Sequence, residues 1–265
     1  MAELIDTHCH LTHPRLAGHV QAVLDRAERA GVVAVVCASA DLAESARAQQ
    51  LAHRHGNVCF TAGLHPHDAR TAEAYYLAVL EGLAGDARCV AVGECGLDYH
   101  HDLSPRDTQR RVFAEQLDLA RRIGRNVVIH MREALDDTLA IVRNSGIDAG
   151  RIVFHSFTEP LPGAQAVLDG GAMIGLSGIV TFANSEPLRQ LAAAVPDDRL
   201  MIETDSPYLS PEPVRKTKTN EPANVVHVAA CLAGARGVSV EAIAELTTAN
   251  ARRFFGLGGP PTAGA

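Results

Sequence analysis

Two histidines separated by one residue, His8 and His10, lie close to the start of the sequence. The residues before them, from Leu4 onward, read as a short strand. Side chains alternate between the faces of a strand, which predicts Asp6, His8 and His10 on one face and Thr7 and Cys9 on the other. Two imidazoles at one strand end are a ready pair of nitrogen ligands for a divalent cation, although an isolated pair is as often surface decoration. The interpretation therefore depends on what the later strands carry.

Later predicted strands also end in side chains that bind metals. A single histidine at a strand end is more often a core or rim residue, but here the pattern recurs along the chain. The residues are His65 beyond the third strand, Glu94 at the end of the fourth, His130 at the end of the fifth, His155 at the end of the sixth, and Glu203 and Asp205 at the end of the eighth. Glu203 and Asp205 are two residues apart, which predicts both on the inward face. This recurrence predicts a metal centre.

The donor set is nitrogen and oxygen without thiolate, which suits Zn²⁺, Mn²⁺, Co²⁺ or Mg²⁺. Six good ligands exceed what one ion needs if water is to keep a position, and two ions bridged by Glu94 account for the surplus. His8, His10 and Asp205 would complete one ion, and His130 and His155 the other. Two metals about 3.5–4 Å apart are the usual device for cleaving phosphate esters. We expect Glu94 and Asp205 to be catalytic, Asp205 as the acid that can take a proton from water.

The elements that must position these residues alternate along the chain. Eight short β-branched runs are predicted as strands, at 4–8, 32–38, 58–63, 89–94, 126–130, 151–155, 172–176 and 199–204. Amphipathic segments between and after them predict helices, among them 18–30, 42–55, 104–123, 134–144, 187–194, 224–236 and 240–255. Ser104, followed by Pro105, is predicted to cap the 104–123 helix.

Such alternation implies parallel strands joined by crossovers. A doubly wound sheet would normally carry a Gly-rich phosphate loop, and the sequence contains no G-x-G-x-x-G or P-loop pattern. Eight units favour an α/β fold of the (β/α)8 TIM-barrel type, as a single domain over residues 1–256. The Gly/Pro/Ala-rich tail, 257–265, is predicted to be disordered.

Composition narrows the class of protein further. A chain of 265 residues with 47% hydrophobic and 21% charged residues is ordinary for one large soluble domain. The net charge of -7 argues against a generally basic nucleic-acid coat, so a polyanion would need a local basic patch or a metal. The first residues lack the basic flank and the apolar segment of a secretory signal. The apolar runs are too short to cross a bilayer. The six cysteines show no C-x-x-C spacing. We expect reduced thiols, no membrane partner and a cytoplasmic location.

Several motifs resemble the TatD-type metal-dependent deoxyribonucleases, in the order of that family and from residue 4 to about 255. They are DTHCHL at 6–11, GLHP at 63–66, GECGLDY at 93–99, FHSF at 154–157, ETDSPYL at 203–209 and NEP at 220–222. The resemblance implies a TIM barrel related to the amidohydrolases and hydrolysis of phosphodiesters, typically at DNA ends. It carries over six ligands, His8, His10, Glu94, His130, His155 and Asp205, and places His65, Glu203 and Asp98 near the metals.

Other residues bear on the substrate. Arg215-Lys216-Thr217-Lys218 follows the last strand, either as a solvated basic loop or as a phosphate clamp, and Arg132 could reach a phosphate. The chain has no Trp, so stacking on bases would fall to Tyr99, Tyr208 or Phe157, or be absent. We expect His100 and His101 at the surface. His13, His53, His55 and His227 are expected to be structural or exposed.

The leading hypothesis is a two-metal nuclease that digests DNA, single strands or ends, from the 3′ terminus. A second hypothesis keeps the barrel but hydrolyses C–N or ester bonds, as amidohydrolases or an aminoacyl-tRNA deacylase do. Many two-metal amidohydrolases bridge their metals with a modified lysine where this sequence has Glu94. A third, from another class, is a metal-stabilised binding protein without turnover.

Overall fold

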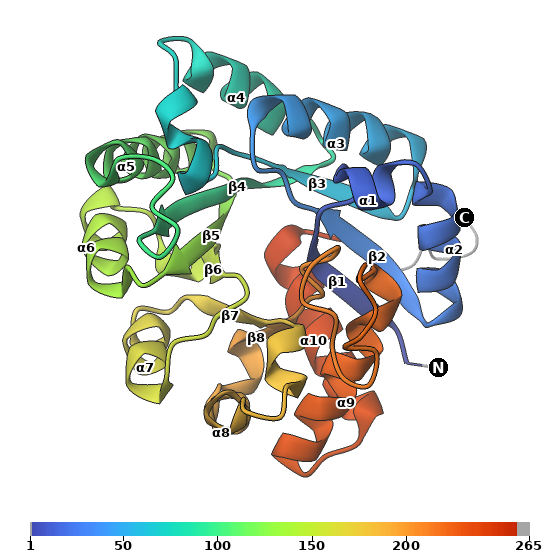
Figure 1. The fold of residues 1–265 in the computed structure, drawn as a ribbon. Helices are drawn as coiled ribbons and strands as arrows, with labels where there is room; N and C mark the ends of the chain where they lie inside the picture. The colour runs from blue at the N-terminus through green and yellow to red at the C-terminus, as the bar shows by residue number, and fades with distance from the viewer. Residues whose placement is uncertain (1, 259–265) are drawn as a thin grey trace.

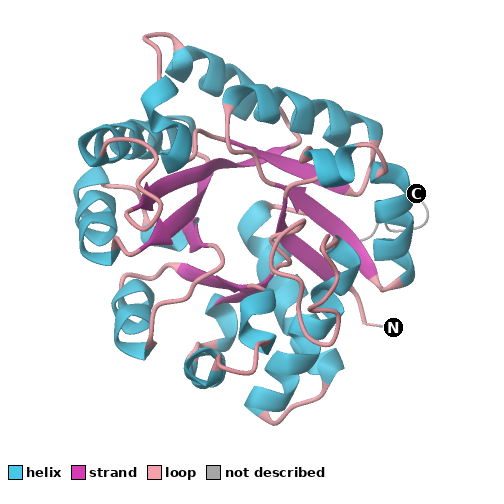
Figure 2. Ribbon diagram, viewed as in Figure 1, coloured by secondary structure: helices cyan, strands magenta, loops and turns pink. Residues whose placement is uncertain are grey.

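The strands of this protein lie in sequence order around a nearly closed barrel. A computed structural model describes residues 2–258, and in it eight parallel strands run β1-β2-β3-β4-β5-β6-β7-β8 (Figures 1 and 2). Their bounds are β1 Leu4–Cys9, β2 Val32–Cys37, β3 Val58–Ala62, β4 Cys89–Asp98, β5 Asn126–Arg132, β6 Ile152–Phe154, β7 Met173–Leu176 and β8 Leu200–Ile202. The seam between β8 and β1 closes beyond the end of β8, where the amide of Asp205 donates to the carbonyl of His8 (2.9 Å) and that of His10 to Ser206 (2.7 Å). The predicted (β/α)8 barrel is confirmed.

Helices surround the sheet, as Figure 2 shows. They are α1 Pro14–Ala17, α2 Val20–Arg29, α3 Leu42–Arg54, α4 Tyr76–Ala84, α5 Arg106–Ile123, α6 Leu135–Ser145, α7 Leu161–Asp169, α8 Glu186–Ala194, α9 Val225–Arg236 and α10 Val240–Phe255. Most predicted bounds agree with these within two residues. The exception is β4, which continues four residues further because Cys95–Asp98 pair with Ile129–Arg132 of β5.

The prediction for Ser104 is wrong. Helix α5 begins at Arg106 with Pro105 in the N-cap position and no side-chain cap. The Ser104 hydroxyl instead donates to the carbonyl of His67 (2.7 Å) and accepts from the amide of Arg70 (3.1 Å). A long-range pair of hydrogen bonds has therefore displaced the local capping interaction, and it fixes the turn after β3 to the loop after β4.

Two hydrophobic layers hold the barrel together. The larger lies between strands and helices, and the smaller fills the interior with Ile5, Val36, Val90, Val128, Val153, Met173 and Met201. Ala251, Phe254 and Phe255 of α10 join the interior cluster, and Asn250 donates to the carbonyl of Leu200 at the start of β8 (2.8 Å). Helix α10 therefore closes the N-terminal end of the barrel and leaves the opposite end for the site. The predicted disorder of the tail is wrong at Leu257, which packs partly buried against this cluster, while residues 259–265 lie outside the described part.

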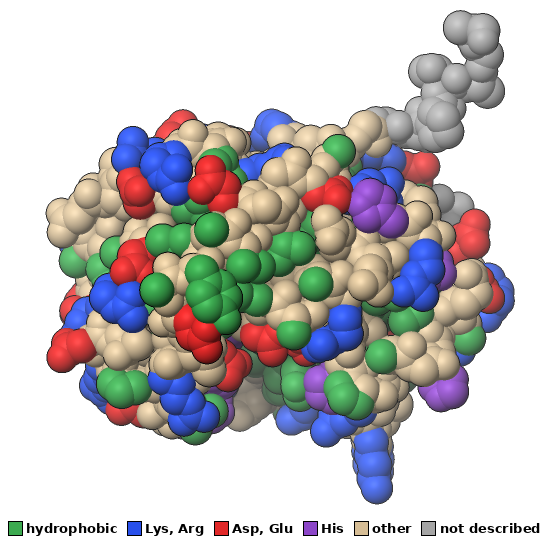
Figure 3. Space-filling model, turned by 90° about the horizontal axis from the view of Figure 1, so that it is seen from above, with side chains coloured by type: hydrophobic (Ala, Val, Ile, Leu, Met, Phe, Trp, Pro, Cys, Tyr) green, Lys and Arg blue, Asp and Glu red, His purple; other side chains and the backbone are tan. Residues whose placement is uncertain are grey.

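The surface mixes charges of both signs. Figure 3 views the side of α3 and α4, and acidic and basic side chains are spread over that face together. Within residues 2–258 no single helix has the length and apolar character to cross a membrane, and only the bent pair Pro222–Arg236 and Val240–Phe255 (111°) meets those criteria together.

Candidate metal centre

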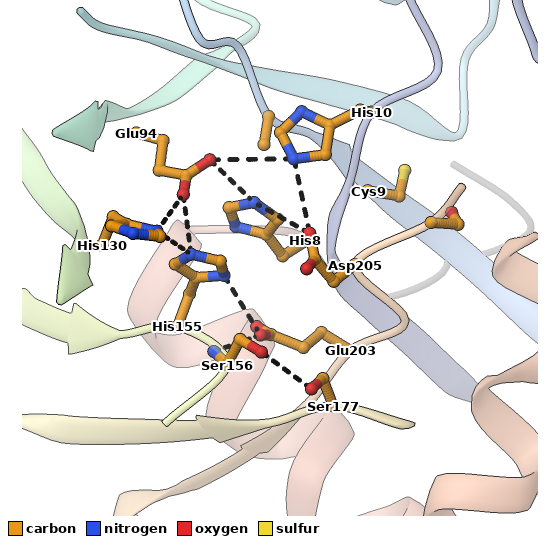
Figure 4. Close-up of polar contacts among 12 residues, drawn as sticks. His8, Cys9, His10, Glu94, His130, His155, Ser156, Ser177, Glu203 and Asp205 are labelled. Atoms are coloured by element: carbon orange, nitrogen blue, oxygen red, sulfur yellow. Dashed lines mark hydrogen bonds and ion pairs between the residues drawn. The ribbon is translucent and has the colours of Figure 1, made fainter. Parts of the chain in front are cut away.

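The predicted ligands converge at the C-terminal end of the barrel. His8, His10, Glu94, His130, His155 and Asp205 point toward one another from five different strand ends (Figure 4). All but His8 line a cavity of about 790 Å³. A pocket of this size is in the range of about 300–1,000 Å³ that small-molecule sites occupy.

Glu94 lies at the middle of the group and directs its two oxygens toward two pairs of histidines. Oε1 lies 3.0 Å from His130 Nδ1 and 2.7 Å from His155 Nε2. Oε2 lies 3.2 Å from His8 Nε2 and 3.7 Å from His10 Nε2. The carboxylate thus divides the histidines into the same two sets that the sequence predicts for two ions.

Asp205 faces the first of these sets. Its Oδ1 lies 3.4 Å from His10 Nε2 and 3.9 Å from His8 Nε2. Its backbone has a φ of 54°, outside the strand region, so ordinary strand alternation does not set its direction. The hydrogen bond from its amide to His8 instead fixes it opposite β1.

Irregularities in strand register aim the key side chains. In β1 the pairing shifts between Asp6 and Cys9, and in β4 it shifts between Val92 and Cys95. An extra residue in one strand locally redirects side chains, and such bulges are common beside active sites. Gly93, inside the second one, permits it, because a Cβ there would lie 2.6 Å from the carbonyl oxygen of Val128 on β5. The extra residues place His8 and Glu94 toward the cavity.

The predicted alternation of faces on β1 is therefore wrong in part. Asp6 does not share the cavity face with His8, because its carboxylate accepts from the amide (2.9 Å) and hydroxyl (2.6 Å) of Thr204. Thr7 lies on the side of Glu203, to which its hydroxyl is 3.4 Å distant. Cys9 does point away, into the outer hydrophobic layer, as predicted.

The donor atoms fit divalent cations. Two groups, His8–His10–Glu94 and Glu94–His130–His155, each have their ligand atoms within 4.8 Å of one another. Atoms that share one ion at about 2.0–2.2 Å lie about 3–3.5 Å apart, which is close to the spacings around Glu94. Both ring nitrogens of His8 are buried and have no hydrogen-bond partner within residues 2–258. Orphaned nitrogens of this kind are costly unless an unseen partner binds them.

The electrostatics favour the same conclusion. Burial alone would raise the pKa of Glu94, but His155, His65 and His8 outweigh it and hold that pKa well below its usual range. Burial lowers the pKa of His8, which keeps this imidazole neutral and able to bind a cation. For His155, burial also opposes the charged form, but Glu94 and Glu203 raise its pKa well above 6.5. The cluster therefore attracts positive charge, either as protons or as metal ions.

Two further carboxylates orient the histidines from behind. Asp98 Oδ2 lies 3.1 Å from His130 Nε2, and Glu203 Oε1 lies 3.4 Å from His155 Nδ1. Glu203 also accepts from the amide of Ser156 (2.5 Å), so its direction is fixed. Carboxylates behind a metal-binding histidine hold the ring in place and strengthen the ligand. Asp98 and Glu203, which were both predicted to lie near the metals, therefore lie behind the histidine ligands.

His65 has a defined tautomer. Its Nδ1 accepts from the amide of His67 (3.1 Å), so in the neutral ring the proton is on Nε2. That Nε2 lies 3.4 Å from Glu94 Oε1. His65 therefore presents an N–H group to the cavity as a hydrogen-bond donor. The lone pair on its Nδ1 already accepts from the amide of His67.

The structure sorts the remaining predicted residues. Arg132 and Tyr208 line the cavity. The Arg106 guanidinium covers the Tyr99 ring at 4.3 Å and Phe157 is buried in the core, so of the three candidate rings neither of these two is placed to stack on a base. The basic loop is exposed, and the guanidinium of Arg215 lies 3.4 Å from the ring centre of Phe182 while Lys216 and Lys218 extend into solvent.

Sequence reasoning missed three histidines of the cavity wall. His101 is exposed, as expected, but it also lines the cavity. His13, which was expected to be structural or exposed, and His67, which was not singled out, line it too. His65 and His67 repeat the one-residue spacing of the first histidine pair, and that signal could have found His67. His100 is exposed and pairs with Glu133 (2.7 Å), as expected for a surface residue.

Comparison with known proteins places this geometry among relatives. Residues 5–256 match the family model described as TatD related DNase. The chain is 39% identical over 255 residues to YcfH of Escherichia coli K12, named an uncharacterized metal-dependent hydrolase, with 95% of each chain covered. It is 37% identical over 259 residues to a protein of Edwardsiella piscicida named 3'-5' ssDNA/RNA exonuclease TatD, covering 96% of this chain and 100% of that one. The solved structure of YjjV, a TatD homologue from Escherichia coli K12, superposes with a TM-score of 0.90 at 29% identity, covering 96% and 98% of the two chains.

Proposed function

Because this chain belongs to the TatD-related DNase family of metal-dependent hydrolases, we propose that it removes nucleotides from the 3′ end of single-stranded DNA with two divalent cations. The observation that carries the proposal is Glu94, whose two oxygens face two separate pairs of histidines at the base of an open cavity. A single-metal hydrolase would not need a carboxylate divided in this way. The name of the Edwardsiella relative supports the polarity and the choice of a single strand.

Nitrogen and oxygen donors of this kind suit Zn²⁺, Mn²⁺, Co²⁺ or Mg²⁺, with His8, His10 and Asp205 on one side of Glu94 and His130 and His155 on the other. Bound there, the cations would act as Lewis acids on the phosphate and on the attacking water.

The chain's own residues then have separable tasks. Asp205 is positioned to receive the proton of the attacking water, because it lines the cavity and its pKa is held below the usual value by His10 despite burial. His65 Nε2 donates a hydrogen bond toward a phosphoryl oxygen. Arg132 offers a positive charge to the next phosphate, and the exposed ring of Tyr208 offers a stacking surface to a base.

End-labelled DNA tests the proposal. With Mn²⁺ or Mg²⁺, a 5′-labelled single strand should shorten progressively, while a 3′-labelled strand should release labelled mononucleotide at once. A strand with a blocked 3′ end and a fully paired duplex should be digested much more slowly. The matched control is Asp205→Asn, which should abolish the ladder. Hydrolysis of only an aryl ester or an amide in parallel assays would instead favour the C–N or ester hydrolase, and no turnover of any substrate would favour a binding protein.

A further inference from the structure

A second convergence of imidazoles lies beside the metal centre, on Asp98. Three ring nitrogens approach the same oxygen, Oδ2: His67 Nε2 at 2.8 Å, His101 Nδ1 at 2.9 Å and His130 Nε2 at 3.1 Å. These side chains come from the turn after β3, the turn after β4 and the end of β5. Asp98 itself is fully buried.

This carboxylate has more nitrogen neighbours than it has lone-pair positions to accept hydrogen bonds. The other oxygen, Oδ1, already accepts the amides of His100 (3.0 Å) and His101 (2.8 Å). Two oxygens offer about four lone-pair positions, two on each, but five nitrogens are directed at them and three converge on Oδ2. At least one of the three nitrogens must then present a lone pair to Oδ2, and two facing lone pairs repel each other unless a cation lies between them.

The metal centre itself shows the same signature. At Glu94, Oε1 has three ring nitrogens within 3.4 Å, from His65, His130 and His155. The arrangement at Asp98 thus repeats, at similar distances, the one that fits cations at Glu94.

We propose that His67, Asp98 and His101 form a third divalent-cation site. Their ligand atoms lie within 4.8 Å of one another. His130 keeps its N–H on Asp98 and stays a ligand of the main centre, whereas His67 and His101 turn lone pairs to the new ion. The preferred ions are those that accept mixed nitrogen and oxygen ligands, Zn²⁺, Mn²⁺ or Co²⁺.

The site is both accessible and held in place. The side chains of His67 and His101 are 27% and 45% exposed and line the cavity, so water or an anionic oxygen can complete the coordination. The backbone of His67 is fixed on both sides, because its amide donates to His65 Nδ1 and its carbonyl accepts from Ser104. The proposal does not depend on which substrate the enzyme cleaves.

Metal stoichiometry tests the third site without an activity assay. Wild-type protein is dialysed against a series of Zn²⁺ concentrations, and bound zinc per chain is measured by mass spectrometry. His101→Ala and His67→Ala should each bind one zinc fewer than wild type at saturation. His100→Ala is the matched control, since His100 is the neighbouring residue with the same 45% side-chain exposure but pairs with Glu133. It should bind as many ions as wild type.

Equal stoichiometry in wild type and His101→Ala would overturn the site, and so would an equal loss in His100→Ala. Because the result is a difference of one ion, it does not depend on how many ions Glu94 holds. Anomalous scattering from zinc-soaked wild-type crystals gives a second measurement that needs no variant. A peak between His67, Asp98 and His101 is expected, and peaks confined to Glu94 would contradict the proposal.

Discussion

Asp205→Asn separates the binding of metal from the transfer of a proton. The amide keeps a carbonyl oxygen where Oδ1 now faces His10 and His8, so it can still bind an ion. It carries no charge and cannot take a proton from water. We therefore expect two distinct effects, one on metal affinity and one on the maximal rate.

The first effect follows from the distances. The nitrogens that would share an ion with Asp205 lie 3.4 and 3.9 Å from its Oδ1. Two unit charges about 4 Å apart interact by about 4 kcal/mol at an effective dielectric constant of 20, and a divalent ion doubles that value. Losing the carboxylate charge should therefore weaken metal binding by about a thousandfold or more. The second effect is loss of a general base, which lowers turnover by about 10²–10⁴ even when metal is saturating.

The assay measures DNA hydrolysis and bound Mn²⁺ over four decades of Mn²⁺ concentration. In Asp205→Asn the metal content should recover at high Mn²⁺ while the rate stays at its low plateau. His8→Ala should lose metal and activity together, and both should recover in part with excess Mn²⁺. Glu212→Gln, an exposed carboxylate on the same loop, should match wild type. If added Mn²⁺ restores Asp205→Asn to a rate near that of wild type, Asp205 is a ligand only and the base lies elsewhere.

Three other changes test separate parts of the molecule. Glu94→Gln removes the negative charge that faces both sets of histidines, so we expect loss of at least one ion and a fall in turnover of several powers of ten. A variant that keeps two ions and near-normal hydrolysis would disprove the idea that Glu94 bridges two ions. Replacing Arg215, Lys216 and Lys218 by Ala should make the affinity for single-stranded DNA less sensitive to salt. The slope of log affinity against log salt should fall by about 0.7 for each phosphate that the loop neutralises in the wild type. An unchanged slope would show that the loop is only solvated. Asp86→Asn should cost about 1–3 kcal/mol of unfolding free energy at pH 7, because this carboxylate accepts three hydrogen bonds that hold its pKa below 3.8 despite partial burial. Stability from a lowered carboxyl pKa is present above 3.8 and is lost as the pH falls through the lowered value, so urea unfolding should show the difference from wild type shrinking only in that acid range.

The position of the site was predictable because parallel strands place their carboxyl ends at one edge. That rule brought His8, Glu94, His130 and His155 together from the order of strands alone. The direction of each side chain was less predictable, since the bulges in β1 and β4 depend on pairing with β2 and β5. Asp6 illustrates the failure, because simple alternation places it with the ligands.

The second layer of the site was beyond local patterns for another reason. Asp98 contacts His67 and His130 across 31 and 32 residues of sequence. Nothing in the order of residues between them specifies that the turn after β3 folds back over the end of β4. The hydrogen bonds of Ser104 to His67 and Arg70, and that of the Arg70 guanidinium to the carbonyl of Leu103, show how the turn is held.

The seam between β8 and β1 determines when the site can form during synthesis of the chain. His8 and His10 are synthesised almost two hundred residues before Asp205. Until the Asp205 amide meets the carbonyl of His8, the ligands on the early side of Glu94 lack their fourth partner. A nascent or truncated chain therefore cannot assemble the first half of the centre, however well its early strands have folded. Asp205, to which we assign proton transfer, is the last of the six predicted ligands to be synthesised. Hydrolysis therefore begins only when the ring of strands is complete.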